Sequence, residues 1–177
     1  MDSLYSRYAI ALLSLAKEEN KVKQYKNEIK MLKHAFLENE GIMHLLSSYN
    51  ITISEKEEII DSFYRAVPNI ANFIKVIVRN KRSKEIIKIF DEFILECNEE
   101  LGIKEGIVYS VDILDDTQVE QIEQALAKKL NVSVELTNLV DTRLIGGVKV
   151  VIEDKVYDGS IKNKLDGLKN MLTNGGL

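Results

Sequence analysis

The residues best suited to metal binding or nucleophilic catalysis are few and stand far apart in this 177-residue chain. Its two histidines, His34 and His44, have no cysteine and no second histidine at the three- or four-residue spacing of a ligand pair on a helix. The single cysteine, Cys97, lies in an apolar helical pattern with no neighbouring base that would lower its pKa, so we expect it in the core. A lone cysteine cannot form an internal disulfide, which suits a reducing compartment. We therefore expect no metal, no cofactor and no active site.

Two further groups could bind a phosphate or a cation. The pair Gly146-Gly147 could approach a phosphate closely, but the chain has neither a GxxxxGK[ST] nor a GxGxxG motif. A β-branched strand pattern follows the pair, where those motifs need a helix. Asp112, Asp115 and Asp116 lack the spaced oxygen ligands of a calcium loop, and they lie where a strand pattern gives way to a helix start. Helix capping and the helix dipole explain these aspartates without a ligand.

One cluster of basic residues is dense enough to suggest an anionic partner. It comprises Lys75, Arg79, Lys81, Arg82, Lys84 and Lys88. Such a patch can bind nucleic acid, or it can be a solvated turn balanced by nearby acidic residues such as Glu85 and Asp91. No aromatic residues interleave with the basic ones, which favours the solvated turn. A nucleic-acid-binding adaptor acting through this patch remains the alternative function.

The composition is that of an ordinary globular protein, with 45% hydrophobic and 29% charged residues. The net charge of -4 arises from 24 basic and 28 acidic residues, so no global field favours nucleic acid or an anionic surface. The N-terminus carries Asp2 where an export signal would carry a basic residue. No run of about 18 apolar residues occurs, so we expect any link to a membrane to pass through a partner.

Apolar residues recur at three- and four-residue steps through the first hundred residues, which is the spacing of amphipathic helices. This pattern predicts six helices, at 4–16, 22–36, 42–46, 55–66, 68–80 and 83–101. Ser54 with Glu57 fits a capping box that would open the fourth helix, and Gly102 fits the end of the sixth. The sequence therefore predicts a six-helix bundle as an N-terminal domain, residues 1–104.

The pattern then changes to the two-residue period of β-strands. We predict a strand at 107–113, a helix opened by a capping box of Thr117 and Glu120, and a strand at 132–136. A hairpin should follow, formed by 144–152 and 156–157 with Gly146-Gly147 in its first arm. Ser160 can cap a last helix, which would carry Leu165, Leu168 and Leu172. The fold class is thus α+β, with a small α/β C-terminal domain at 105–177.

The C-terminal part resembles a family signature. The residues that carry it are Leu144, Gly146, Gly147, Val148 and Val150, followed by Asp158, Gly159 and Ser160. At the other end, Arg7-Tyr8-Ala9 with Ala11 resembles the first helix of the same family, the F-type ATP synthase delta subunit. Its mitochondrial counterpart is the oligomycin sensitivity-conferring protein. The resemblance covers essentially all of the chain, although Val151 departs from a family pattern that turns polar at that point.

The resemblance implies a non-catalytic peripheral-stalk subunit, a stator, at the cytoplasmic face of the bacterial cell membrane. It implies that the helical domain binds the N-terminal helices of the α subunits on the catalytic head. It also implies that the C-terminal domain binds the C-terminal end of the b subunit. Leu165, Leu168 and Leu172 are candidates for that contact only if their helix is not fully used for the core. Nucleic acid is not among the implied partners, and the membrane is reached only through the complex.

Within that role we expect the α-subunit helix to lie in a groove between the first and fifth helices, where the small Ala11 would admit the partner's backbone. The expected lining is Tyr8, Ala11, Leu12 and Leu15 on one wall and Phe73, Val76, Ile77 and Asn80 on the other. For Leu12 and Ile77, packing inside the helical core is an equal alternative.

Overall fold

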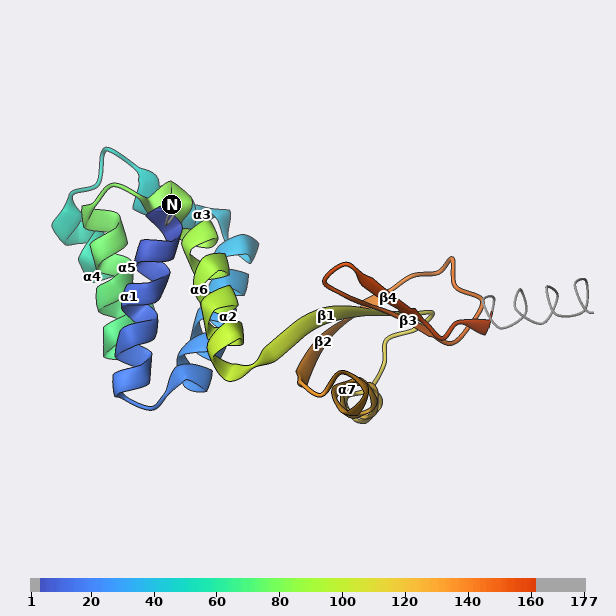
Figure 1. Ribbon diagram of the computed structural model, residues 1–177. Coiled ribbons are helices and arrows are strands. Elements are labelled where there is room, and N and C mark those ends of the chain that lie inside the picture. Colours follow the sequence, from blue (N-terminus) through green and yellow to red (C-terminus); the bar gives the residue numbers. More distant parts are fainter. Residues whose placement is uncertain (1–3, 162–177) are drawn as a thin grey trace, which may run out of the picture. The chain divides into compact units, whose positions relative to one another are not determined.

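The computed structural model describes residues 4–161, and the chain divides into two compact units (Figure 1). The units are Met1–Leu101 and Gly102–Leu177. The boundary expected after residue 104 lies inside the first strand, because Gly102 adopts a left-handed φ of 62° that ends the last helix of the first unit. Leu165, Leu168 and Leu172 lie outside the described residues.

The first unit is helical. Its elements are α1 (Leu4–Glu18), α2 (Val22–Glu38), α3 (Glu40–Ser47), α4 (Ile53–Phe63), α5 (Pro68–Arg79), a 3-10 turn η1 (Ser83–Glu85) and α6 (Ile86–Leu101). Pro68 occupies the first helical position of α5, where its missing N–H is not needed. With the small sheet of the second unit, these helices confirm the mixed fold class that the sequence predicts.

The core of the helical unit forms around α6, on which α1 and α2 pack. Phe90 and Phe93 of α6 are fully buried, and the ring of Phe90 lies 5.9 Å from that of Phe36 on α2. Cys97 is buried in the same core, as expected, and burial raises the pKa of its thiol to about 12. The thiol is therefore protonated and unreactive at neutral pH.

Two helices begin two residues earlier than the sequence suggests, so both expected capping boxes are wrong. In α4 the box is Thr52 with Glu55, whose backbone N–H donates to Thr52 Oγ1 at 3.3 Å while Thr52 N donates to Glu55 Oε2 at 2.8 Å. In the helix of the second unit the box is Asp115 with Gln118. The spacing of a capping box occurs in two overlapping registers at both places, and local sequence does not decide between them.

The second unit contains β1 (Ile103–Ser110), α7 (Asp116–Leu130), β2 (Ser133–Val140), β3 (Val148–Ile152) and β4 (Lys155–Asp158). The strand order is β2-β1-β3-β4, with β1 and β2 parallel and the other pairs antiparallel. The helix α7 provides the crossover between the two parallel strands. Asn131 ends α7 in the left-handed conformation, with φ of 54°.

In the sequence the more apolar alternating set of this strand is Ile107, Tyr109, Val111 and Ile113, but β1 buries the set that contains Val108 and Ser110. Val108 is fully buried together with Val134 and Val150, whereas Ile113 lies beyond the strand and is 83% exposed. Both alternating sets contain apolar residues, so only the position of α7 decides which set is covered.

No helix in the described part of the chain has both the length and the apolar character of a membrane span.

Candidate functional site

A groove runs between α1 and α5, which lie side by side in the helical unit (Figure 1). Its volume is about 690 Å³. The lining residues are Leu4, Arg7, Tyr8, Ala11, Leu12 and Leu15 from α1, Asn69, Asn72, Phe73 and Val76 from α5, and Asn80 and Arg82 from the turn after α5. Within α1 and α5 every lining residue has another lining residue three or four positions away, so each set follows one side of its helix.

The groove exists because α1 has two apolar sides and the helical core covers only one. Ala9, Leu12 and Ala16 are fully buried, and α1 packs far more extensively on α6 than on α5. Leu15, on the second side, remains 41% exposed, and Val76, on the α5 wall of the groove, is 43% exposed. An apolar surface of this kind, framed by two helices, is suited to a third helix.

Side-chain contacts join the two walls of the groove. The Tyr8 and Phe73 rings meet edge to face at 6.3 Å between centroids. Asn80 Nδ2 donates to Tyr8 Oη at 2.9 Å, which joins the start of α1 to the end of α5. The two helices therefore run in opposite directions along the groove.

At the other end of the groove, the side-chain amide of Asn69 joins the start of α5 to the residues that follow α1. Asn69 Nδ2 donates to Glu19 Oε1 at 2.6 Å and to Tyr25 Oη at 3.1 Å. Burial raises the pKa of Tyr25, so its phenol stays protonated and can accept this hydrogen bond while keeping its own proton. Both walls are thus fixed at each end by side-chain contacts between elements that are distant in sequence.

The structure brings together seven of the eight residues expected in the groove. Those seven are Tyr8, Ala11, Leu12, Leu15, Phe73, Val76 and Asn80. Ile77 does not line the groove; it is fully buried in the core, one of the two alternatives open for it. Leu12 lines the floor although its side chain is also fully buried.

Five lining residues were not among the expected eight, and four of them are polar. They are Leu4, Arg7, Asn69, Asn72 and Arg82. Leu4 and Arg7 lie on the same helical stripe as Ala11, and Asn69 and Asn72 lie on that of Val76, so spacing alone could have found them. A search for apolar periodicity passes over polar residues that border an apolar stripe.

Two members of the basic cluster that follows Pro68 form ion pairs with acidic residues of α4. Lys75 Nζ lies 2.6 Å from a carboxylate oxygen of Asp61, and the Arg79 guanidinium forms a two-point pair with Glu57. Hydrogen bonds from Arg79 lower the pKa of Glu57. Lys88 Nζ lies over the ring of Tyr5, 5.8 Å from its centroid. This arrangement fits the solvated, balanced turn and gives the nucleic-acid alternative no support.

The signature glycines of the second unit form a tight backbone contact rather than a ligand loop. Gly146 and Gly147 lie in the loop before β3, not inside a hairpin arm as expected. Gly147 has φ of 76°, and a Cβ there would lie 2.6 Å from the carbonyl oxygen of Gly159. Ile161 N donates to Gly146 O at 2.9 Å. The two halves of the signature are therefore held against each other.

The remaining signature residues support the same contact. Gly159 N donates to Val148 O and Ser160 N donates to Asp158 Oδ1, each at 2.9 Å, and the side chain of Ser160 is buried. Val150 is buried on the α7 side of the sheet, and Leu144 is half-buried in the loop. This arrangement accounts for the spacing between the glycine pair and the Asp158-Gly159-Ser160 segment.

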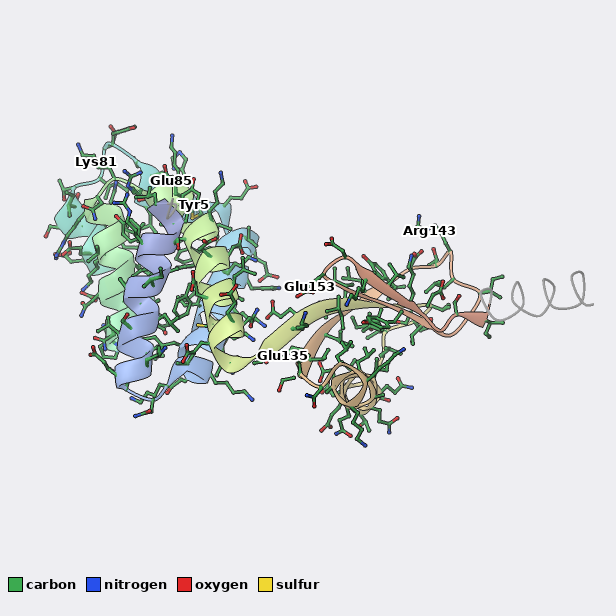
Figure 2. The ribbon with its side chains drawn as sticks, in the orientation of Figure 1. Tyr5, Lys81, Glu85, Glu135, Arg143 and Glu153 are labelled. Carbon is green, nitrogen blue, oxygen red and sulfur yellow. The ribbon has the colours of Figure 1, made fainter. Side chains whose placement is uncertain are left out.

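The loop between β2 and β3 carries an ion pair between Asp141 and Arg143. Figure 2 shows Arg143 and Glu153, a residue of the β3–β4 hairpin, at opposite ends of the sheet. Arg143 donates from Nε to Asp141 Oδ1 at 2.8 Å, from Nη2 to Oδ2 at 2.9 Å and from its backbone N to Oδ1 at 3.0 Å. These hydrogen bonds lower the pKa of Asp141 to about 2. The pair braces the loop that ends in the glycine contact.

Residues 4–161 contain no group of three or more potential metal-binding side chains. Asp115 caps α7, and β3 follows the glycine pair where a phosphate loop would require a helix.

Comparisons with known proteins agree over nearly the full length of the chain. The profile of the ATP synthase delta (OSCP) subunit family matches residues 4–172. The ATP synthase subunit delta of Mycoplasma mobile is 36% identical over 170 residues, covering 93% of each chain. That of Bacillus velezensis is 32% identical over 171 residues, covering 96% of this chain and 94% of the relative.

A solved structure shares the fold. It is a chain in the cryo-EM structure of the Toxoplasma gondii mitochondrial ATP synthase hexamer, with a TM-score of 0.66. The alignment covers 97% of this chain and 98% of that chain at 18% sequence identity.

Proposed function

The chain belongs to the ATP synthase delta (OSCP) subunit family, and we propose that its α1–α5 groove binds the N-terminal helix of an ATP synthase α subunit. It is a peripheral-stalk subunit of an F-type ATP synthase, a structural part of that complex. The peripheral stalk holds the catalytic head against the torque of rotation, so such a subunit needs rigid, extensive contacts with its neighbours.

The observation that carries the proposal is the uncovered apolar side of α1 opposite α5. A bound helix would remove Leu15 and Val76 from water, at about 25 cal/mol for each Å² of apolar surface buried. Ala11 lines the same groove with only a methyl group, so the backbone of the partner can approach closely at that point. Tyr8 and Phe73 would provide a rigid aromatic floor.

The test is a substitution that fills the groove without touching the core. Ala11→Trp should abolish binding of a synthetic peptide that copies the N-terminal helix of the cognate α subunit, measured by calorimetric titration, while the thermal unfolding of the chain stays unchanged. The matched control is Ala35→Trp, since Ala35 is also exposed, on α2, but lies away from the groove. Equal affinity of wild type and Ala11→Trp would place the contact elsewhere.

We further propose that the sheet unit binds the C-terminal end of the b subunit and that the protein works without an active site. Joining the head to the stalk requires two separate binding surfaces, and the division of the chain into two compact units is compatible with one surface on each. The protein then sits at the cytoplasmic face of the membrane and reaches it only through the complex. Binding of the full chain to a peptide that copies the C-terminal end of the b subunit, retained in Ala11→Trp, would support this division of roles.

A further inference from the structure

The groove has different chemistry at its two ends. Arg7 from the first turns of α1 and Arg82 from the turn after α5 both line it at the end where Tyr8 meets Asn80. Figure 2 shows Tyr5 and Lys81, their neighbours in sequence, at this same end of the helical unit. The opposite end is lined by the neutral amides Asn69 and Asn72. No aspartate or glutamate lines the groove anywhere along its described walls.

The two arginines differ from Lys75 and Arg79, the two basic residues of α5. Lys75 and Arg79 pair with Asp61 and Glu57 of the neighbouring helix α4. Neither Arg7 nor Arg82 forms an ion pair with any carboxylate in the part of the chain that the structure describes. Arg82 is already half-buried, so a helix laid over it would remove much of its remaining hydration.

We propose that the groove recognises an acidic amphipathic helix, one that places a carboxylate beside its apolar stripe at the end that covers Arg7 and Arg82. The proposal rests on the function proposed above, binding of the N-terminal helix of an α subunit. It adds the charge pairing that would select this helix and fix its position along the groove. A guanidinium covered by an apolar partner would lose hydration without compensation, which is strongly unfavourable, whereas a carboxylate can pair with it through two hydrogen bonds. Charge complementarity of this kind gives specificity and register to an otherwise apolar contact.

The chain's own C-terminal sequence has the wrong charge for this position. Residues 162–177 carry Lys162, Lys164 and Lys169 against the single Asp166, so the segment is basic. A basic segment would be repelled by the two arginines. The occupant is therefore assigned to a partner protein.

The experiment is a titration of the full-length chain, at 50 and 300 mM salt, with the synthetic peptide that copies the N-terminal helix of the cognate α subunit. For the wild-type chain the affinity should fall several-fold at the higher salt, because the paired charges are partly screened. The double variant Arg7→Gln/Arg82→Gln should bind about tenfold more weakly at low salt and lose most of the salt dependence. A second peptide, with its acidic residues changed to glutamine, should bind wild type and double variant alike.

The control for net charge is Lys23→Gln/Lys128→Gln, which removes two positive charges at exposed positions outside the groove. It should change the affinity by less than about twofold. If the arginine double variant binds as tightly as wild type with the same salt response, acid recognition is wrong although the groove remains. If the wild-type chain does not bind the peptide at all, the proposed function itself fails. If the wild-type chain associates with itself in a salt-dependent way and the arginine double variant does not, the groove binds a second copy of the chain. That result would overturn the proposal.

Discussion

The two units of this protein reach a defined structure by different means. The helical unit buries large side chains from each of its six described helices in one cluster around α6, including Phe36, Phe90 and Phe93. The described part of the sheet unit buries few apolar residues, all aliphatic, and relies on places where only glycine fits, at Gly106 and Gly147. Side-chain volume therefore dominates the stability of the first unit, and close backbone contact dominates the geometry of the second.

This difference bears on function. Because α6 anchors α1 from one side with a large core, the second apolar side of α1 can stay uncovered without loss of the fold. In the described part of the sheet unit a single long helix, α7, covers one face, so its loops need specific contacts to stay in place. The tight Gly146-Gly147 contact and the Asp141–Arg143 pair meet that need.

The largest expected effect is in the helical core. Phe90→Ala should lower the free energy of unfolding of the helical unit by about 3 to 5 kcal/mol, because a fully buried ring on α6 leaves a cavity that its neighbours cannot fill. Urea denaturation followed by circular dichroism at 222 nm measures the change. Leu37→Ala, at an exposed position on α2, is the control and should cost less than about 0.5 kcal/mol. Similar costs for the two variants would contradict the central place of α6.

A smaller effect should follow from a methyl group at the glycine contact. Gly147→Ala should destabilise the sheet unit by about 2 to 4 kcal/mol, since it combines a left-handed φ with a clash against the Gly159 carbonyl. Gly102→Ala is a matched control, because Gly102 also has a left-handed φ but no atom within 4 Å of the added Cβ. It should cost about 1 kcal/mol.

Amide hydrogen exchange of the β1 and β3 strands can measure how much each glycine variant destabilises the sheet unit. The loss of protection in Gly147→Ala should exceed that in Gly102→Ala. Equal losses would mean that backbone conformation alone, and not the contact between the two signature segments, decides the cost.

The smallest effect is electrostatic. The pKa of the Asp141 carboxyl should be about 2 in the folded chain, lowered from its ordinary value of 3.8 by the hydrogen bonds from Arg143. Because the folded pKa is the lower one, the pair stabilises the fold above about pH 4 and its contribution is lost as the pH falls to about 2. Carboxyl NMR titration of Arg143→Gln should show the Asp141 pKa return toward 3.8. The Glu153 carboxyl, whose pKa Lys104 lowers, should not shift and serves as the internal reference.

Much of the groove follows from helical spacing in the sequence. The apolar stripes of 8, 11, 12 and 15 and of 73 and 76 predict the lining because a helix repeats every 3.6 residues. Asn80 follows from the same stripe, while Arg7 and Arg82 are polar and escape a search for apolar residues. The family, too, is identified from sequence, since its profile matches residues 4–172 and the spacing of the glycine signature corresponds to a backbone contact at Gly147.

Other features were decided only by tertiary packing. Ile77 and Val76 are adjacent and both apolar, and it is the position of α1 and the core that buries one and leaves the other on the groove. The capping boxes of α4 and α7 each had two possible registers, and the strand β1 had two apolar faces until α7 covered one. Periodicity fixes which residues share a face, since that is local geometry. Which face is covered depends on neighbours distant in the chain, and no local pattern contains that information.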